Sequence, residues 1–265
     1  LFKNNIEFVI HSSRQINFLN QIKNFKESHP VWLKFDSGMN RLGFSIEDSS
    51  IIFEEVSKKT NQIVLMSHFN SFKGNAKQLK KFKDLEKRCS SDNISVKKSL
   101  CNSGGMINYP VSQKDIARPG ISIFGSRSNL KDKNIKLKSV MTLKSKFISL
   151  KELEKGEKVG YEGTWQAKKR TKVGILPIGY GDGYPINLSN CGKVFIKGNL
   201  APVIGKVSMD MVAIDLTNIR KISYKDEVIL WGKGHKVDTV AKYADNSSYS
   251  LMTGITKRVR KVYKS

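Results

Sequence analysis

The chain has 265 residues, 39% of them hydrophobic, and a formal net charge of +24. This length permits one large domain or two ordinary ones, and the hydrophobic share excludes a disordered chain. No apolar run approaches the ~18–20 residues of a membrane-spanning helix. Three cysteines, odd in number and without CxxC spacing, exclude a disulfide framework and indicate a reducing cytoplasmic compartment and no metal site.

The first half of the chain alternates predicted strands with predicted helices. Strands are predicted at 6–10, 31–35, 63–66 and 96–101, with a fifth around 121–124, and helices from Ser12 or Ser13 to Phe25, from Ser45 to Val56 and at 78–88. Strand starts recur roughly every 25–33 residues, as successive βα units do. The pattern predicts a parallel sheet or barrel, and five units are too few to close an eight-stranded barrel.

The second half is rich in predicted strands separated by glycine-bearing turns. Strands are predicted at 140–143, 172–176, 193–196, 203–207 and 228–231, with one helix at 239–244. A second, mainly β domain is therefore expected. Its boundary is placed in the polar stretch 126–137, which gives domains 1–132 and 133–265.

Polar groups stand at the ends of the predicted strands, where a parallel sheet presents its active-site residues. Lys34 lies inside an apolar strand and must be satisfied, either by an ion pair with Asp36 or by conversion to a carbamate that anchors Arg41. Residue types alone do not separate these two interpretations. His68 follows the third strand, where a satisfied core histidine and a catalytic one are about equally expected.

Two further turns carry groups that suit an anion. The Asn-Ser-Gly-Gly turn at 102–105 suits a phosphate, although it is also ordinary turn chemistry. Arg118 stands beside another glycine-bearing turn, for which a surface position is the plain alternative. The basic composition, mostly lysine, is spread along the whole chain, and the usual nucleic-acid-binding signatures are absent. The favoured interpretation is that the basic residues cover solvated surfaces. A nucleic-acid-binding protein stays the alternative from another class.

Seven strings along the chain stand in a distinctive order and spacing. The first half carries Trp-Leu-Lys-Phe-Asp-Ser-Gly-Met-Asn-Arg-Leu-Gly at 32–43, Ser-His-Phe at 67–69, Cys-Asn-Ser-Gly at 101–104 and Ala-Arg-Pro-Gly-Ile at 117–121. The second half carries Gly-Tyr-Glu-Gly-Thr-Trp at 160–165, Gly-Tyr-Gly-Asp-Gly-Tyr-Pro at 179–185 and Val-Ser-Met-Asp at 207–210. Taken in order, these strings resemble the alanine racemases, and the resemblance covers essentially the whole chain. It implies the last five or so βα units of a (β/α)8 barrel, followed by a mainly β domain.

The family inverts L- and D-alanine with pyridoxal phosphate by a two-base mechanism, supplying D-alanine for peptidoglycan, and works as a homodimer with shared sites. By resemblance, Tyr161 is the base on the L-alanine face, and His68 and Arg118 form a hydrogen-bonded network with it. Arg118 also matches the arginine that faces the pyridine nitrogen. Arg41 matches the residue near the phenolic oxygen of the cofactor and the substrate carboxylate, and Met209 the position whose backbone N–H meets that carboxylate. The remaining matches are the phosphate positions Ser103, Gly120 and Ile121, the lysine that is carbamylated in some members at Lys34, and the narrow access channel at Tyr180 and Asp210.

One departure concerns the lysine that attaches the cofactor and serves as the D-face base. The family carries it in a Lys-Ala-Asn-Ala-Tyr-Gly-like string near the N-terminus, and no such string occurs in these 265 residues. The match begins at about the fourth barrel strand, so the chain is expected to be truncated and inactive by itself. A second departure is Lys257, where some members have a tyrosine that meets the phosphate. A racemase for another small amino acid, such as serine, is the alternative within this class.

Overall fold

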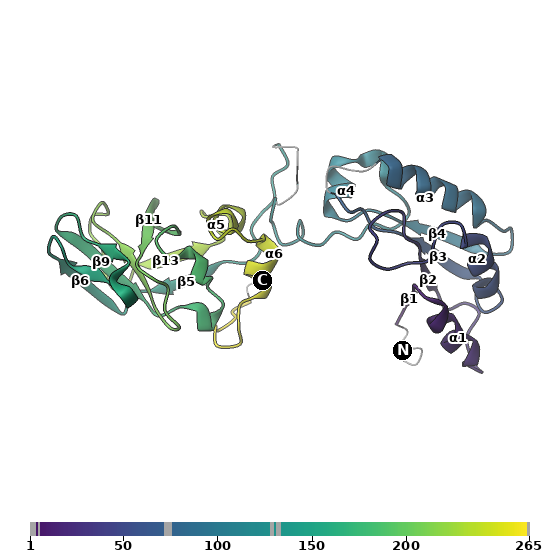
Figure 1. Cartoon of the computed structure of the whole chain (residues 1–265), viewed down its shortest axis with the longest axis horizontal. Helices are drawn as coiled ribbons and strands as arrows, with labels where there is room; N and C mark the ends of the chain where they lie inside the picture. Colours follow the sequence, from purple (N-terminus) through teal and green to yellow (C-terminus); the bar gives the residue numbers. More distant parts are fainter. Residues whose placement is uncertain (1–3, 5, 72–75, 128–129, 131–133, 264–265) are drawn as a thin grey trace. The chain divides into compact units, whose positions relative to one another are not determined.

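A computed structural model describes residues 4, 6–71, 76–127, 130 and 134–263 of the chain (Figure 1). The chain divides into two compact units, the first formed by residues 1–120 with 129–135 and the second by residues 121–128 with 136–265. The expected domain boundary between residues 132 and 133 lies outside the described residues and stays a prediction.

The first unit is a parallel sheet with helices between its strands, as the alternating sequence pattern predicts. Within the described residues its four strands run side by side in chain order: β1 (Phe8–Ile10), β2 (Val31–Lys34), β3 (Gln62–Met66) and β4 (Ser95–Ser99). The connecting helices are α1 (Ser13–Gln21), α2 (Ser49–Ser57) and α3 (Ala76–Arg88). Because the strands are parallel, their carboxyl ends meet at one edge of the sheet.

Apolar spacing explains which face of each helix is buried. In α3, Leu79, Phe82 and Leu85 recur every three residues and are at most 5% exposed, while Lys87 and Arg88 occupy the last turn, where cations favour the helix dipole. Just before α1, the His11 backbone N–H donates to Gln15 Oε1 (2.8 Å). A side chain of the helix thus provides the hydrogen-bond acceptor for this backbone group. Packing against the sheet, rather than intrinsic propensity, therefore holds these short helices.

The prediction of a fifth strand around 121–124 is wrong. Residues 121–125 form a turn, in which the Phe124 N–H donates to the Ile121 carbonyl (3.2 Å) and the Gly125 N–H to the Ser122 carbonyl (3.1 Å). Gly125 has φ +84°, and a Cβ there would lie 1.9 Å from the Lys138 carbonyl oxygen. The backbone is satisfied locally, so the apolar run does not join the sheet. The structure instead adds α4 (Ser103–Asn108) and the 3₁₀ turn η2 (Pro110–Ser112), where only turns were expected.

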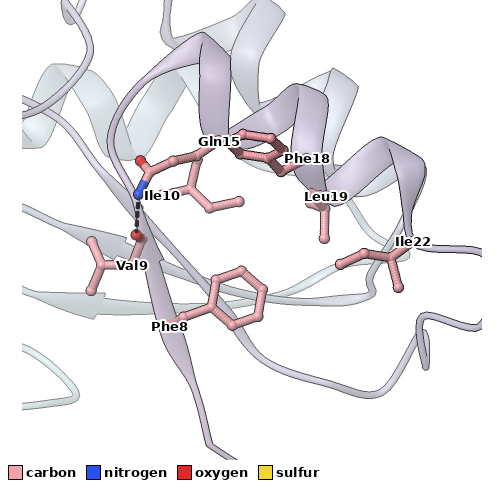
Figure 2. Close-up of a pocket in the computed structure, with 7 residues that line it drawn as sticks. All are labelled: Phe8, Val9, Ile10, Gln15, Phe18, Leu19 and Ile22. Carbon is pink, nitrogen blue, oxygen red and sulfur yellow. Dashed lines mark hydrogen bonds between the residues drawn. The ribbon is translucent and has the colours of Figure 1, made fainter. Parts of the chain in front are cut away.

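An apolar pocket of about 370 Å³ lies between α1 and β1, which is an outer strand of the described sheet (Figure 2). Figure 2 shows the Phe8, Ile10, Leu19 and Ile22 side chains around it, while Gln15 Nε2 donates to the Val9 carbonyl at 3.5 Å. None of the site residues expected from the sequence lines this pocket. It is a gap in apolar packing beside the sheet edge.

The second unit is mainly β, as expected. Seven antiparallel strands among its described residues form one sheet in the order β5 (Leu143–Lys146), β13 (Glu227–Trp231), β10 (Lys193–Ile196), β11 (Asn199–Ile204), β12 (Val212–Asp215), β9 (Thr171–Leu176) and β6 (Ser149–Leu153). The other elements are the hairpin β7 (Lys158–Val159) and β8 (Trp165–Gln166), the 3₁₀ turns η3 (Tyr161–Gly163), η4 (Tyr180–Asp182) and η5 (Ile186–Leu188), and the helices α5 (Val237–Tyr243) and α6 (Ser248–Thr253).

The expected strands at 172–176, 193–196 and 228–231 are confirmed to within one residue. Two others are displaced: the strand expected at 140–143 begins at Leu143, and the one expected at 203–207 spans 199–204. β6, β12 and α6 were not expected. Among the described helices the longest has 13 residues, and none has the length and apolarity needed to cross a membrane.

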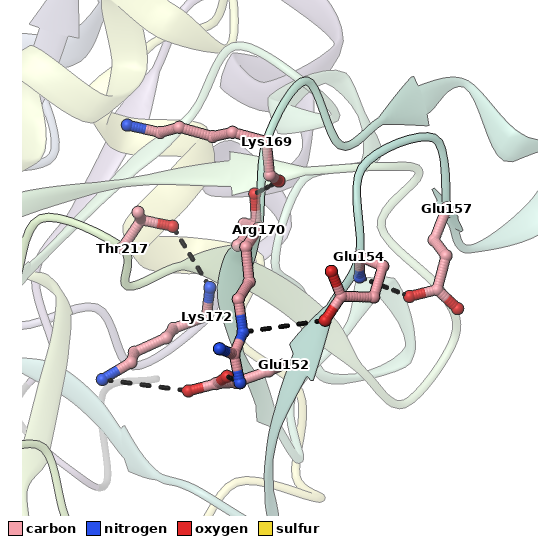
Figure 3. Close-up of polar contacts among 8 residues, drawn as sticks. Glu152, Glu154, Glu157, Lys169, Arg170, Lys172 and Thr217 are labelled. Atoms are coloured by element: carbon pink, nitrogen blue, oxygen red, sulfur yellow. Dashed lines mark hydrogen bonds and ion pairs between the residues drawn. The ribbon is translucent and has the colours of Figure 1, made fainter.

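The outer strand β6 carries charges that deter pairing with another chain. Arg170 on the neighbouring turn pairs with Glu152 of β6 and, more loosely, with Glu154 (3.7 Å), and Lys172 of β9 lies 4.0 Å from Glu152 (Figure 3). All four side chains are at least 40% exposed, so these pairs contribute little to stability. Such charged side chains disfavour hydrogen bonding of the exposed edge of β6 to a strand of another chain.

Candidate functional site

The carboxyl ends of β2, β3 and β4 bring together the polar groups expected in the first unit. Lys34 is the last residue of β2, His68 follows β3, and Ser99 ends β4. Arg118 reaches the same place because its backbone N–H donates to the Cys101 carbonyl (2.9 Å), beyond the end of β4. This arrangement agrees with the expectation that polar groups gather at the carboxyl ends of the strands.

Arg118 and His68 are in direct contact. Arg118 Nη2 lies 3.3 Å from His68 Nδ1 and donates to the Ser67 carbonyl at 2.6 Å, and Nη1 donates to Ser99 Oγ. Arginine has donors only, so His68 Nδ1 is the acceptor in this contact, and Asn102 Nδ2 lies 3.4 Å from His68 Nε2 on the other side of the ring. The guanidinium is held by neutral acceptors, and of its five N–H groups some are left for a further acceptor.

The turn after β2 places Arg41 near this pair. The Phe44 N–H donates to the Lys34 carbonyl (2.9 Å), and the Asp36 N–H donates to the Phe44 carbonyl (2.8 Å), which closes the turn. Gly43 has φ +128°, and a Cβ there would lie 2.7 Å from the Asp36 nitrogen, so only glycine fits. The closed turn holds Arg41 close enough to act on the charge of Lys34.

Lys34 is 8% exposed and lies among like charges. Burial lowers its pKa, Arg41 and Arg118 lower it further, and Asp36 acts in the opposite direction. Asp36 Oδ1 accepts the N–H groups of Gly38 (2.7 Å) and Met39 (2.8 Å), and no ion pair joins it to Lys34, both residues being described. Burial raises the pKa of Asp36, but the backbone hydrogen bonds outweigh it and the net pKa is lowered. The ion-pair interpretation of Lys34 is therefore wrong.

Sequence reasoning missed the buried hydrogen bonds that fix these strand ends. Ser67 Oγ donates to the Phe35 carbonyl (2.8 Å) and lies 2.7 Å from Ser37 Oγ, so β2 and β3 are tied where the cluster begins. Gln78, at 2% exposure in α3, donates to the His68 carbonyl (3.0 Å). The one available signal was a glutamine directly beside the buried apolar positions of an amphipathic helix.

The phosphate positions are partly brought together. The Gly120 N–H donates to Ser103 Oγ at 2.8 Å, so the turn at Gly120 closes on the start of α4. Ile121, the next residue, is 2% exposed and belongs to the second unit, where its carbonyl accepts the Phe124 and Ser126 N–H groups. Two of the three positions that the resemblance gives to the phosphate are therefore in direct contact, and their role stays a prediction.

The second unit carries Tyr161, Met209, Tyr180 and Asp210. Tyr161 begins the 3₁₀ turn η3 at the tip of the β7–β8 hairpin, and 70% of it is exposed. The Tyr180 N–H donates to the Ser208 carbonyl (3.0 Å), so the turn that bears Tyr180 is attached to the loop that bears Met209 and Asp210. Tyr180, Met209 and Asp210 are thus neighbours within this unit.

Arg258 holds the same loop from the C-terminal side, and sequence reasoning missed it. Its Nη2 pairs with Asp210, and its Nε lies 3.3 Å from Asp182 Oδ1. Asp182 in turn accepts the Gly179 N–H at 2.9 Å, beside Tyr180. Nothing in the sequence analysis singled out Arg258, although this arginine links two turns of the candidate site.

His68 makes the stability of the first unit depend on pH. Burial, followed by the charges of Arg118, Lys34 and Arg41, lowers its pKa from 6.5 to about 4. Between these values the unfolded chain binds the proton and the folded chain does not, so we expect the free energy of unfolding to decrease as pH falls from 6.5 to 4. After a discount for solvent screening the loss is about 1–2 kcal/mol.

Urea denaturation at pH 4 to 7, with an NMR titration of the His68 ring, measures this effect. His68→Gln is expected to flatten the slope for the first unit, while the second unit keeps a slope of its own from His235, whose pKa burial also lowers. A His68 pKa near 6.5 in the folded protein would contradict the prediction.

Comparison with known proteins gives one consistent answer. Two family models match: the alanine racemase N-terminal domain over residues 1–128 and the alanine racemase C-terminal domain over residues 140–263. The alanine racemase of Actinobacillus succinogenes is 38% identical over 269 residues, covering 98% of this chain and 74% of the relative. That of Pasteurella multocida is 38% identical over 266 residues, covering 98% and 73%.

Solved structures agree. The biosynthetic alanine racemase of Pseudomonas aeruginosa superimposes with a TM-score of 0.88 at 33% identity, covering 99% of this chain and 74% of that one. The enzyme of Acinetobacter baumannii gives 0.86 at 34% identity, covering 97% and 73%. At 24% identity, the Bartonella henselae alanine racemase, solved with covalently bound pyridoxal phosphate, shares the fold with a TM-score of 0.87. The chain belongs to the alanine racemase family, whose members depend on pyridoxal phosphate.

Proposed function

We propose that this chain, once joined to the lysine that attaches the cofactor, interconverts L- and D-alanine and so supplies D-alanine for peptidoglycan. The observation that carries the proposal is 38% identity to curated alanine racemases over 98% of the chain. The contact between His68 and Arg118 at the strand ends supports it, because both residues occupy positions that the family resemblance assigns to the proton-transfer network.

The first unit offers a site that fits pyridoxal phosphate. Lys34, Arg41 and Arg118 act together on His68, and the nearby carboxylate of Asp36 is occupied by backbone N–H groups, so the cluster has an excess of positive charge. An anion offsets such an excess, and the phosphate and the ring oxygen of the cofactor both provide one. When bound, the cofactor supplies the electron sink that acidifies the Cα–H bond of alanine.

Each residue of the first unit then has a stated task. When the cofactor is bound, Arg118 would donate to its pyridine nitrogen, and because it stays charged it would hand over no proton there. Arg41 would face the ring oxygen and the substrate carboxylate. Ser103 and Gly120, with the adjacent Ile121, would hold the phosphate. By family resemblance, His68 would help, through Arg118, to position the phenol of the partner subunit's Tyr161 and its proton.

In the second unit Tyr161 removes or returns the proton on the L-alanine face, at its phenol oxygen. The Met209 backbone N–H binds the substrate carboxylate, while Tyr180 and Asp210 narrow the access channel to small amino acids. By family resemblance these groups serve the site of the partner subunit in a homodimer. The exposure of Tyr161 (70%) and Met209 (51%) in the single chain is compatible with that task.

Lys34 is proposed to be carbamylated. Its lowered pKa leaves a larger neutral fraction of the amine, which adds to CO₂ and releases one proton to give the carbamate. The negative carbamate replaces a cation between Arg41 and Arg118 and removes two like-charge repulsions. This proposal concerns positioning of Arg41, and mass spectrometry after trapping of the carbamate tests it.

A fusion protein tests the racemase activity. Residues 1–265 are joined behind a segment that carries the family's Lys-Ala-Asn-Ala-Tyr-Gly-like string, and conversion of L-alanine is followed with a D-amino-acid oxidase coupled assay. We expect turnover and cofactor absorbance in this fusion racemase. We expect neither from residues 1–265 alone, since they contain no string like that of the family's lysine.

L-serine and the lysine-to-alanine version of the fusion racemase serve as controls. Turnover of L-serine faster than that of L-alanine would replace the proposed substrate. Absence of turnover from a soluble, cofactor-bound fusion racemase would contradict the proposed function.

A further inference from the structure

Asn190 connects two segments that the proposed function uses. It follows the 3₁₀ turn η5 with φ +59°, a left-handed conformation that asparagine tolerates better than other side chains. Its Oδ1 accepts the Gly205 N–H at 2.6 Å, and its Nδ2 donates to Thr164 Oγ1 at 3.0 Å. One amide therefore uses both of its ends to bridge the loop after β11 and the hairpin tip between β7 and β8.

The hairpin tip that bears Tyr161 makes few hydrogen bonds within itself among the described residues. Gly160, Glu162 and Gly163 all have positive φ, and the turn is closed locally by the Gly163 N–H donating to the Gly160 carbonyl at 3.2 Å. Tyr161 itself is largely exposed, so burial of its ring does not fix it. Contacts from outside the hairpin must set where the phenol lies.

The other segment leads to Met209 and packs against the same hairpin. Gly205 lies so close to Val159 that a Cβ on it would be 2.8 Å from the Val159 carbonyl oxygen, and Lys206 pairs with Glu162 at 2.5 Å. The Lys206–Glu162 pair is largely solvated and so constrains weakly. The Asn190 bridge is the directional contact, because it fixes a side chain on one segment and a backbone N–H on the other.

We propose that Asn190 is a positioning residue that holds the proton-transfer tyrosine at a fixed place relative to the Met209 loop. It acts through Thr164 on the Tyr161 turn and through Gly205 on the loop that carries the carboxylate-binding N–H. The inference rests on the proposed function for its catalytic consequence. The bridge itself is a property of the single chain and can be measured without cofactor.

Three variants of the 265-residue chain separate the two ends of the bridge. Asn190→Gly keeps the left-handed backbone and removes both contacts, while Thr164→Val removes one. Asn187→Ala is the matched control, since Asn187 sits in η5, three residues before Asn190, and its amide points to the Ala244 carbonyl (3.5 Å) instead. The readouts are the ¹³C-tyrosine resonance of Tyr161, assigned with Tyr161→Phe, and the exchange rate of the Gly205 amide.

We expect Asn190→Gly to shift or broaden the Tyr161 resonance and to speed Gly205 exchange at least tenfold. Thr164→Val should move the Tyr161 resonance without changing Gly205 exchange, and Asn187→Ala should change neither. A Tyr161 resonance in Asn190→Gly identical to that of the unmodified, equally folded chain would overturn the inference.

The fusion racemase gives the catalytic readout. Asn190→Gly is expected to lower kcat for L-alanine at least fivefold and to raise the α-deuterium isotope effect measured from L-alanine but not from D-alanine, because only the transfer at Tyr161 is slowed. A purely structural role would leave these isotope effects unchanged and would also overturn the inference. If Tyr161→Phe leaves turnover intact, the role proposed for the Tyr161 phenol fails, whatever the resonance of Tyr161 reports about Asn190, whereas absence of turnover from the fusion racemase would count against the proposed function itself.

Discussion

Replacing Tyr161 by phenylalanine is expected to lower racemisation by the fusion racemase roughly 10²- to 10⁴-fold, the usual contribution of a positioned acid–base group. Phenylalanine keeps the ring and removes only the hydroxyl that carries the proton. Because Tyr161 is 70% exposed, its ring contributes little to the core, and the free energy of unfolding should change by less than about 0.5 kcal/mol. The oxidase-coupled assay and urea denaturation measure the two quantities.

Proton exchange in D₂O makes this prediction sharper. Loss of the L-face base should stop exchange of the α-proton of L-alanine, while exchange from D-alanine continues through the lysine of the fused segment. Tyr249→Phe is the matched control, since Tyr249 is also exposed (47%) and lies in α6, far along the chain from the hairpin. Turnover of Tyr161→Phe within threefold of the parent would contradict the role assigned to the phenol.

The polar cluster of the first unit could be predicted because chemistry and topology coincide there. Lys34 and His68 stand at the ends of apolar runs, and parallel pairing of β2 with β3 brings such ends to one edge. The direct contact between Arg118 and His68 is different. It depends on the Arg118 backbone N–H, which donates to the Cys101 carbonyl beyond the end of β4. The hydrophobic periodicity of a sequence does not predict such a long-range backbone contact.

The errors have local physical causes. The run at 121–124 has the residue types of a strand, but its backbone groups pair within a turn that ends at Gly125. The helix α4 was missed because Ser-Gly-Gly is a poor helix former, yet Asn102 caps it by accepting the Gly105 N–H at 2.9 Å. In both places a few specific hydrogen bonds outweigh propensity.

Contacts between distant turns were beyond sequence reasoning altogether. Asn190 reaches Thr164 and Gly205, and Arg258 reaches Asp182 and Asp210, across loops whose separation in the chain carries no signal. Such residues look like ordinary turn or surface polar groups in a sequence. They are also the ones on which the geometry of Tyr161, Tyr180 and Met209 depends, so family motifs name the reacting groups but not what positions them.

Two substitutions of Arg118 separate its charge from its geometry. After burial, the Arg118 cation is the largest cause of the lowered His68 pKa, so Arg118→Gln is expected to raise that pKa above about 4. Burial and the charges of Lys34 and Arg41 remain, so the pKa should stay below 6.5. Arg118→Lys keeps the charge and should leave the His68 pKa near its present value.

Both substitutions should nevertheless slow racemisation, by about 10- to 100-fold, because neither side chain can bond the Ser67 carbonyl, Ser99 and His68 at once and still face the cofactor. The His68 pKa is read from an NMR titration, and turnover from the coupled assay, for both variants. If Arg118 acted on catalysis only through its charge, Arg118→Lys would retain full turnover. A lysine variant that is slow although its His68 still titrates near 4 would therefore assign the loss to the forked geometry of the guanidinium rather than to the electrostatic field.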